Sequence, residues 1–277
     1  MTISNVDNGS AGRFAGKVAV ITGAAQGIGF AAAQRMGREG CRIVIADFSA
    51  GPAAEAVAAL KAEGIEAIAA VGDLSVYTQA EATMQQAKQA FGAIHILVNN
   101  VGGTIWMKPF WHYTEDEIRT EVNRSFWPTM WCARAVIPVM RETGGVIVNV
   151  SSNAVEGEYR IPYSASKGAV EALTTALAVE VAGFGIRVNC VAPGGTSAPE
   201  RKTQRNVQPV TAQDQQWQEQ FMMLLKDEEL LTPWSTAEQQ AGVITFLASD
   251  DAAHITGEII HTGRRGKRIF DKLGFIP

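Results

Sequence analysis

Tyr163 and Lys167 stand four residues apart in a segment rich in helix-forming residues. That spacing puts both side chains on one face of a helix, where the lysine charge can act on the tyrosine hydroxyl. A tyrosine hydroxyl ordinarily titrates near about 10, so it acts as a general base at neutral pH only beside positive charge. The pair can accept a proton from an alcohol, although the same spacing also arises by chance on surface helices.

Runs of β-branched apolar residues alternate with helix-forming segments along the chain. Such runs predict buried strands, and the segments between them are long enough for helices that connect parallel strands. We therefore expect an α/β fold, with a Rossmann-type doubly wound parallel sheet in a single domain. The predicted strands are residues 17–22, 42–47, 66–71, 94–99, 145–151 and 186–191, and the predicted helices are 28–38, 53–63, one from about 115, and 162–182.

The domain is expected over residues 14–263, after a flexible N-terminal segment 1–13 and before a C-terminal tail 264–277. Residues 194–229 are polar and interrupt the alternation, which predicts a functional loop with short helices of its own. Substrate contacts are expected to concentrate in that loop. The basic residues of the tail are expected to be a solvated end, and a contact with a neighbouring subunit is the alternative.

The composition indicates a globular protein without general affinity for nucleic acid or anionic lipid. Apolar residues make up 47% of the 277 residues, and 24 Lys and Arg against 28 Asp and Glu give a net charge of -4. Cys41, Cys132 and Cys190 lack the paired spacing of a zinc or redox motif, so buried, reduced thiols and no metal are expected. The absence of a long apolar run and the polar start predict a cytoplasmic protein.

A glycine-rich segment, TGAAQGIG at 22–29, lies between the first predicted strand and the first predicted helix. Gly23, Gly27 and Gly29 let a backbone approach a phosphate closely, and the amides and dipole of the helix favour the negative charge. This indicates a dinucleotide site. A glycine-rich turn by itself also forms tight turns without a ligand, and the flanking strand and helix favour the dinucleotide.

Asp47 ends the second predicted strand, where its carboxylate can accept hydrogen bonds from the adenosine ribose. The carboxylate would repel the additional phosphate of NADP, and residues 24–26 offer no basic side chain to that phosphate. NAD is therefore predicted, against the alternative that Asp47 only begins a turn. Asp73, followed by Leu74, ends the third strand, and contact with adenine and capping of the next helix are equally open.

The order of several short motifs resembles the short-chain dehydrogenase/reductase family. The motifs are TGAAQGIG at 22–29, GDLS at 72–75, NNVGG at 99–103, VNVSS at 148–152, YSASK at 163–167 and APGG at 192–195, and the resemblance covers roughly residues 14–260. Each motif is short, and their combined order is specific. The resemblance implies an NAD-dependent oxidoreductase that forms a homo-oligomer, often a tetramer.

The resemblance also implies a catalytic tetrad of Asn123, Ser152, Tyr163 and Lys167. In the family the serine orients the substrate hydroxyl, the tyrosine takes its proton, and the lysine activates the tyrosine and holds the nicotinamide ribose. The asparagine positions a water in the proton relay. Ser151 is the structural alternative to Ser152, because the two are adjacent and the segment before Tyr163 is shorter than is usual in the family.

Residues at the motif positions are expected to bind the cofactor. Thr196 stands slightly before the position of the family's usual threonine. The implied cofactor contacts are Gly23, Gln26, Gly27, Ile28, Gly29, Asp47, Asp73, Leu74, Asn100, Gly102, Tyr163, Lys167, Pro193, Gly194 and Thr196.

Two stretches narrow the resemblance to dehydrogenases that follow aromatic-ring dioxygenases on benzoate-type substrates. They are NNVGGTIWMKPFWHY at 99–113 and the later PGGTSAPERKTQRN. The narrower resemblance implies NAD-dependent oxidation of 1,6-dihydroxycyclohexa-2,4-diene-1-carboxylate to a catechol with loss of carbon dioxide, in aromatic-compound degradation. Some members of this group carry arginine where Asn123 stands, and HTGRRGKRIF replaces the usual glycine pair, but Tyr163 and Lys167 are present.

Basic side chains after the Pro-Gly turn can pair with the carboxylate of such a substrate. Arg201 and Arg205 are expected to contact the substrate together with Ser152 and Tyr163, with Lys202 between them in sequence. A solvated basic face is the simpler alternative. Four aromatic residues after the fourth strand can wall a pocket for a flat ring, or pack within a long loop or a subunit interface; they are Trp106, Phe110, Trp111 and His112.

Two other functions remain open at this stage. The same fold and tetrad serve short-chain enzymes that act on other alcohols or ketones, such as a 3-oxoacyl thioester or a sugar. A non-catalytic NAD-binding protein with the dinucleotide fold is a second alternative, and the complete tetrad argues against it.

Overall fold

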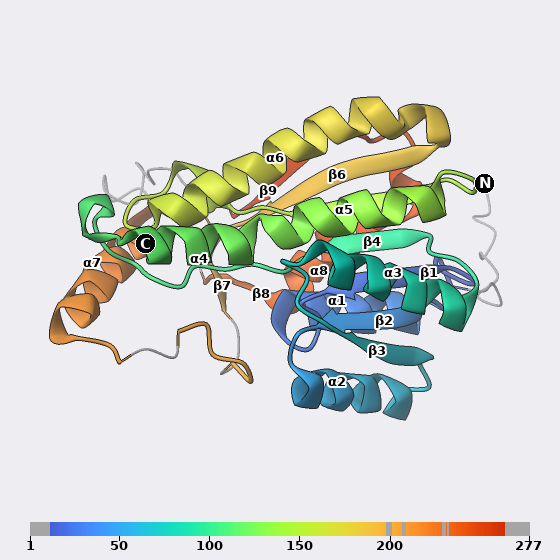
Figure 1. The fold of residues 1–277 in the computed structure, drawn as a ribbon, viewed down its shortest axis with the longest axis horizontal. Coiled ribbons are helices and arrows are strands. Elements are labelled where there is room, and N and C mark those ends of the chain that lie inside the picture. The colour runs from blue at the N-terminus through green and yellow to red at the C-terminus, as the bar shows by residue number, and fades with distance from the viewer. Residues whose placement is uncertain (1–11, 198–200, 207–208, 229–230, 232, 264–277) are drawn as a thin grey trace, which may run out of the picture.

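The computed structural model describes residues 12–263, apart from 198–200, 207–208, 229–230 and 232. A seven-stranded sheet in the order β3-β2-β1-β4-β5-β6-β9 crosses the molecule, and each neighbouring pair of strands is parallel (Figure 1). The predicted fold class is confirmed. The strands are β1 (Val18–Thr22), β2 (Arg42–Asp47), β3 (Ala67–Val71), β4 (Ile96–Asn99), β5 (Gly145–Val150), β6 (Ile186–Pro193) and β9 (Ile259–Thr262).

The central strands form because their β-branched and apolar residues are buried on both faces of the sheet. Every residue of β1 is buried, and so is every residue of β2 except Arg42. β9 lies at an edge, where its residues are half-buried or exposed. The buried centre of the sheet therefore fixes where each strand ends, and the residues that follow those ends form the site described below.

Two groups of helices cover the two faces of the sheet. One core contains α1 (Gly27–Arg38), α2 (Ala50–Ala62) and α8 (Ala237–Ala248), and the other contains α3 (Tyr77–Phe91), α5 (Trp127–Met140) and α6 (Ile161–Val181). α4 (Glu115–Ser125) precedes α5 in the chain, and a break at Phe126 separates the two helices. α4 packs against α6. The short 3₁₀ helices are η1 (Phe110–His112), η2 (Asn153–Glu156), η3 (Ala182–Phe184) and η4 (Asp250–Ala252).

The polar region 194–229 contains a helix of 17 residues, α7 (Ala212–Glu228), where only short helices were predicted. α7 stands apart from the sheet, on the side of the carboxyl ends of the strands (Figure 1). It is predominantly polar, and Phe221 and Leu225 are its buried contacts with the rest of the chain. β7 (Thr196–Ser197) pairs with β8 (Ser235–Thr236), which joins the start of this region to the segment before α8.

Within the described residues, no helix has the length and apolar character needed to cross a membrane. Cys41, Cys132 and Cys190 are free and buried, as predicted. Burial raises the pKa of each thiol to about 12, so each sulfur stays protonated at neutral pH. The predicted flexible segment and basic tail lie mostly outside the described residues.

Candidate active site

A cavity of about 610 Å³ opens at the carboxyl ends of the strands, beside β1 and β4. The strand order reverses between these two strands, and open α/β sheets bind ligands in the crevice at such a point. Every predicted site residue except Gly29 lines this cavity. The residues are Gly23, Gln26, Gly27, Ile28, Asp47, Asp73, Leu74, Asn100, Gly102, Asn123, Ser152, Tyr163, Lys167, Pro193, Gly194, Thr196, Arg201 and Arg205.

The turn between β1 and α1 is held in shape by Asn100, which follows β4. The Asn100 amide donates hydrogen bonds to the carbonyl oxygens of Thr22 at 3.0 Å and Gly23 at 3.1 Å. Gly29 faces this amide, and a Cβ at Gly29 would lie 2.6 Å from Asn100 Nδ2. Gly29 therefore allows α1 to pack closely against the β4 loop, whereas Gly23 and Gly27 line the cavity directly.

Asp47 lies at the end of β2 and is 8% exposed. Its Oδ2 accepts a hydrogen bond from the amide of Ala25 at 3.3 Å, and its Oδ1 accepts one from the amide of Ser49 at 3.1 Å. The carboxylate is thus held against the glycine-rich turn by two backbone amides. Asp47 therefore lies at the cavity, as predicted, and also takes part in a turn, which was the alternative interpretation.

Asp73 lines the cavity beside Leu74. Its carboxylate accepts hydrogen bonds from the amide and hydroxyl of Ser75, at 3.0 and 2.7 Å. The helix that follows begins after Val76, which is its N-cap residue, so Asp73 does not cap it. The alternative that Asp73 caps the next helix is wrong. Asp73 instead forms a turn beside the cavity.

Tyr163 and Lys167 lie near the start of α6, on the face turned to the cavity. Lys167 is 2% exposed, its Nζ donates a hydrogen bond to the Val150 carbonyl at 2.7 Å, and Nζ lies 5.8 Å from the centre of the Tyr163 ring. Burial lowers the pKa of Lys167, and the adjacent Tyr163 opposes that effect. The structure therefore brings the buried lysine charge next to the tyrosine.

The two adjacent serines have different surroundings. The Ser151 hydroxyl contacts the Lys167 carbonyl at 3.2 Å and the Glu171 carboxylate at 2.7 Å, which ties β5 to α6. Ser152 Oγ accepts a hydrogen bond from the amide of Ala154 at 3.1 Å, and its side chain borders the cavity with Tyr163. Since an acceptor role leaves the Ser152 proton available, Ser152 has the better geometry for contact with a ligand.

Gly102 and Gly103, which follow β4, leave space for two cationic side chains. A Cβ at Gly102 would lie 2.9 Å from Lys167 Nζ, and a Cβ at Gly103 would overlap the Arg205 guanidinium. Both glycines have φ of 142°, which side chains rarely adopt. The backbone after β4 therefore lies directly against the lysine of α6 on one side and the arginine of the 194–229 region on the other.

Residues 201–206, here called the strap, cross the mouth of the cavity. At one end the Lys202 amide donates to Gln26 Oε1 at 2.8 Å, and the Lys202 ammonium pairs with Glu55 of α2 at 2.8 Å. At the other end Arg205 Nη1 donates to the Thr104 carbonyl at 3.3 Å. The strap thus connects the glycine-rich turn with the loop after β4, and Lys202 is not among the residues that line the cavity.

Three guanidinium groups meet where the strap passes α4. Arg124 Nη1 donates to the Arg205 carbonyl at 2.9 Å. Burial and the charge of Arg201 lower the pKa of Arg205 to about 10, and burial together with Arg124 lowers the pKa of Arg201. Glu121 is the buried carboxylate beside them, and its Oε1 accepts the amides of Ile105 and Trp106 at 2.7 and 3.1 Å. The carboxylates of Glu121 and Asp47 both act on Arg124, so three guanidinium groups face two carboxylates. The remaining positive charge favours an anionic ligand.

Sequence reasoning missed several residues of the cavity wall. Arg124 follows the predicted Asn123 directly, and Arg160 lies three residues before Tyr163. Ile105, Met222, Leu225 and Trp234 supply apolar parts of the wall. Proximity in sequence to Asn123 and Tyr163 was the available signal for the two arginines.

Of the two alternatives for the four aromatic residues, a wall of the cavity does not describe them, because none of them lines it. Trp111 is 82% exposed and Phe110 is 50% exposed. The His112 ring lies 4.7 Å from that of Trp217 on α7, and Trp106 accepts the Tyr113 hydroxyl through its carbonyl at 2.7 Å. Packing within the loop, the alternative, describes Trp106 and His112.

Comparison with known proteins gives the same assignment over most of the chain. The family model described as short chain dehydrogenase matches residues 17–209. The chain belongs to the short chain dehydrogenase family. It is similar to 1,6-dihydroxycyclohexa-2,4-diene-1-carboxylate dehydrogenases from Acinetobacter baylyi, at 49% identity over 91% of this chain and 96% of the relative, and from Pseudomonas putida, at 46% identity over 88% and 90%.

A solved short chain dehydrogenase from Mycobacterium smegmatis has the same fold, with a TM-score of 0.74 and 28% identity over 90% of this chain and 92% of that one. This short chain dehydrogenase is therefore an oxidoreductase that uses a nicotinamide cofactor. The residues of the cavity fit such a group: Gly23 and Gly27, both with φ of 60°, line it without a side chain at two positions of the glycine-rich segment, and Asp47 lies at the end of β2.

Proposed function

We propose that this dehydrogenase oxidises a cis-dihydroxycyclohexadiene carboxylate of benzoate type with NAD, producing a catechol and carbon dioxide. The names of its relatives from A. baylyi and P. putida support this substrate. The observation that carries the proposal is the excess of guanidinium groups in the cavity that also contains Tyr163. The diol is flat, and its carboxylate would supply the charge that Arg201 and Arg205 lack.

The proposed tetrad divides the proton chemistry among four side chains. Ser152 donates a hydrogen bond that orients the reacting hydroxyl, and Tyr163 takes the proton of that hydroxyl. The buried charge of Lys167 stabilises the tyrosinate that removes the proton and would hold the nicotinamide ribose. Asn123 positions a water that returns the proton to solvent.

When bound, NAD supplies the hydride acceptor, and the residues for it are those of the glycine-rich turn together with Asp47, Asp73, Leu74, Asn100 and the segment Pro193 to Thr196. NAD is proposed over NADP because the Asp47 carboxylate lies where a further phosphate on the ribose would be repelled.

Loss of carbon dioxide follows from the position of the carboxylate. Oxidation leaves a ketone on the carbon next to the one that bears the carboxylate and the second hydroxyl. The bond to the carboxylate carbon then breaks, its electron pair forms an enolate, and protonation of the enolate oxygen gives the catechol. Ser152 and Tyr163, which contact the ketone oxygen in this arrangement, stabilise the charge that develops on it.

Two further predictions extend this proposal. A homotetramer is proposed with α5 and α6 among its contact faces, and the 81% exposed Val179 on α6 supports an apolar contact there. The cytoplasmic location stays a prediction.

The substrate is tested by following NADH absorbance, carbon dioxide and catechol with 1,6-dihydroxycyclohexa-2,4-diene-1-carboxylate and with the uncharged cis-diol that lacks its carboxylate. We expect a strong preference for the charged diol, and Arg201→Gln should raise its KM by about tenfold or more while sparing the uncharged one. Lys202→Gln is the matched control, because its ammonium pairs with Glu55, and its KM should stay within about twofold. Equal use of both diols by the unmodified enzyme would contradict the proposed substrate.

A further inference from the structure

Arg124 lies in the last turn of α4 and lines the catalytic cavity. Its Nη1 donates a hydrogen bond to the backbone carbonyl of Arg205 at 2.9 Å, which joins α4 to the strap over 81 residues of sequence. The donor carries a charge and the bond is partly buried, and such hydrogen bonds are stronger than those between neutral groups. This contact therefore fixes the backbone of the strap at Arg205 against α4.

The side chain of Arg205 is held by the loop after β4, and that loop also depends on α4. Arg205 Nη1 donates to the Thr104 carbonyl at 3.3 Å. The next two amides, those of Ile105 and Trp106, donate to the fully buried carboxylate of Glu121 at 2.7 and 3.1 Å. Glu121 is one turn before Arg124 on α4. One helix therefore positions both the backbone of Arg205 and the carbonyl that receives its guanidinium.

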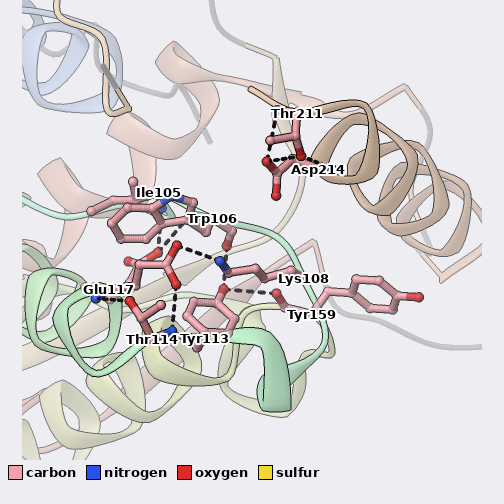
Figure 2. A network of polar contacts seen from close by, with 10 residues as sticks. Ile105, Trp106, Lys108, Tyr113, Thr114, Glu117, Tyr159, Thr211 and Asp214 are labelled. Atoms are coloured by element: carbon pink, nitrogen blue, oxygen red, sulfur yellow. Dashed lines mark hydrogen bonds and ion pairs between the residues drawn. The ribbon is translucent and has the colours of Figure 1, made fainter. Parts of the chain in front are cut away.

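α4 is itself fixed at both of its ends. At its start, Thr114 and Glu117 form a capping box, and the Glu117 carboxylate also pairs with the Lys108 ammonium at 2.6 Å (Figure 2). The Lys108 and Glu117 side chains are only 10% and 13% exposed. At its end, Ser125 Oγ accepts the Gly103 amide at 3.3 Å. The helix is therefore a firm support for the side chains that reach the strap.

The charges around the three arginines divide them into two kinds. Burial lowers the pKa of Arg124, and the carboxylates of Glu121 and Asp47 oppose that effect. A cation in the last turn of a helix is also favoured by the helix dipole. Burial lowers the pKa of Arg201 and of Arg205 as well, and the next largest cause for each is the charge of a neighbouring arginine. The charge of Arg124 is thus balanced within the protein, whereas an anionic ligand would relieve the two arginines of the strap.

We propose that Arg124 is a positioning residue that gives the enzyme its specificity for a carboxylate through Arg205, an inference that rests on the proposed function. Arg124 holds the Arg205 backbone from α4, and the Thr104 carbonyl holds one end of the guanidinium. Between these two contacts the Arg205 side chain lines the cavity, where the substrate carboxylate is proposed to bind. Without the first contact, the strap no longer holds Arg205 in that place.

The test measures kcat and KM of Arg124→Gln, Arg205→Gln and the double variant on the charged and the uncharged diol. Arg124→Gln should raise the KM for the charged diol by about tenfold, the loss typical of a charged hydrogen bond, with kcat changed far less. The KM values for the uncharged diol and for NAD should stay within about twofold. In the Arg205→Gln background, Arg124→Gln should raise the KM for the charged diol by less than about twofold, because no guanidinium is left to position.

Two further variants complete the test. Arg124→Lys keeps a cationic donor and should raise the KM for the charged diol less than Arg124→Gln does, and it replaces Arg124→Gln in the double variant if that protein does not fold. Arg119→Gln is the matched control, because Arg119 lies on α4 in an ion pair whose carboxylate is 76% exposed. It should change neither KM.

Three results would overturn the inference and leave the proposed function standing. Equal losses on both diols after Arg124→Gln would assign Arg124 to the fold alone. Losses that multiply fully in the double variant would mean that Arg124 binds the carboxylate directly. An unchanged KM for the charged diol after Arg124→Gln would remove its role in specificity. No preference of the unmodified enzyme for the charged diol would instead contradict the proposed function.

Discussion

The two sides of the cavity are built in different ways. The side toward β1 and β2 consists of the glycine-rich turn and of residues that directly follow buried strands, such as Asp47 and Asn100. The side toward α7 consists of segments far apart in sequence, namely the loop after β4, Arg160, and the end of the strap around Arg205. The ends of the sheet strands position the first side, with short hydrogen bonds from Asn100 and Asp47 to the adjoining turn, whereas contacts between loops position the second.

This difference explains how one fold combines a constant reaction with a selective pocket. Strand ends are held by the ladder of the sheet, so the groups proposed for the cofactor depend little on their neighbours. The substrate side depends on hydrogen bonds and ion pairs such as Lys108 with Glu117. Changes on the two sides should therefore have separable effects, on cofactor binding and catalysis or on substrate selection.

The largest expected effect concerns Tyr163, which lies between the two sides of the cavity. Tyr163→Phe should lower kcat by at least about 10³-fold, because the substrate proton loses its acceptor. NAD affinity, measured by fluorescence titration, should remain within about threefold, since the phenyl ring preserves the packing next to Lys167. Turnover near the original rate would disprove the assignment of Tyr163 as the general base.

The second largest expected effect concerns the contribution of the substrate side to the stability of the fold. Glu117→Gln keeps an acceptor for the capping box but leaves the Lys108 ammonium without its buried counter-charge, and should lower the free energy of unfolding by about 3 kcal/mol. Denaturant unfolding measures this. The control is Glu115→Gln, whose ion pair with Arg119 is exposed on both sides and should contribute less than about 1 kcal/mol.

Glu117→Gln should also raise the KM for the charged diol and leave NAD affinity unchanged, because α4, the helix that carries Arg124, starts in this network. Equal weakening of cofactor and substrate binding would show that the two sides are not separable.

The smallest effect concerns cofactor choice. Asp47→Asn keeps the shape of the side chain and removes the charge that would repel a ribose phosphate, so the ratio of kcat/KM for NADP to that for NAD should rise by about tenfold. Asp73→Asn is the control, since Asp73 forms a turn with Ser75, and should leave that ratio unchanged. A ratio that does not respond to Asp47→Asn would mean that another feature selects NAD.

The sequence predicted the sheet and the cavity position of the residues proposed for the cofactor, because both depend on where buried strands end. Buried β-branched runs identify the strands, and residues that follow parallel strands gather at one edge, so Asp47, Asp73 and Asn100 could be placed together. Helical spacing put Tyr163 and Lys167 on one face, and the order of the surrounding motifs distinguished this pair from pairs that arise by chance. Gly29 shows the limit of this rule, because the pattern included it among cofactor residues whereas it packs α1 against Asn100.

The substrate side could not be predicted in the same way. Arg160 lines the cavity directly after Tyr159, whose left-handed backbone contacts Lys108 and Tyr113 about fifty residues earlier. Trp111 and Phe110 had the composition of a pocket wall, but the 3₁₀ turn η1 leaves them exposed. The polar α7 lacked the periodicity of a core helix, and its contacts depend on loops whose path no local pattern gives.

The two adjacent glycines after β4 lie against side chains with different proposed roles, one in the reaction and one in substrate selection. A side chain at Gly102 would meet Lys167, and one at Gly103 would displace Arg205. If these residues have the proposed roles, the first change should lower turnover of every alcohol and the second should affect mainly anionic substrates. Substitutions at these two adjacent positions are therefore expected to differ in the range of substrates that they affect.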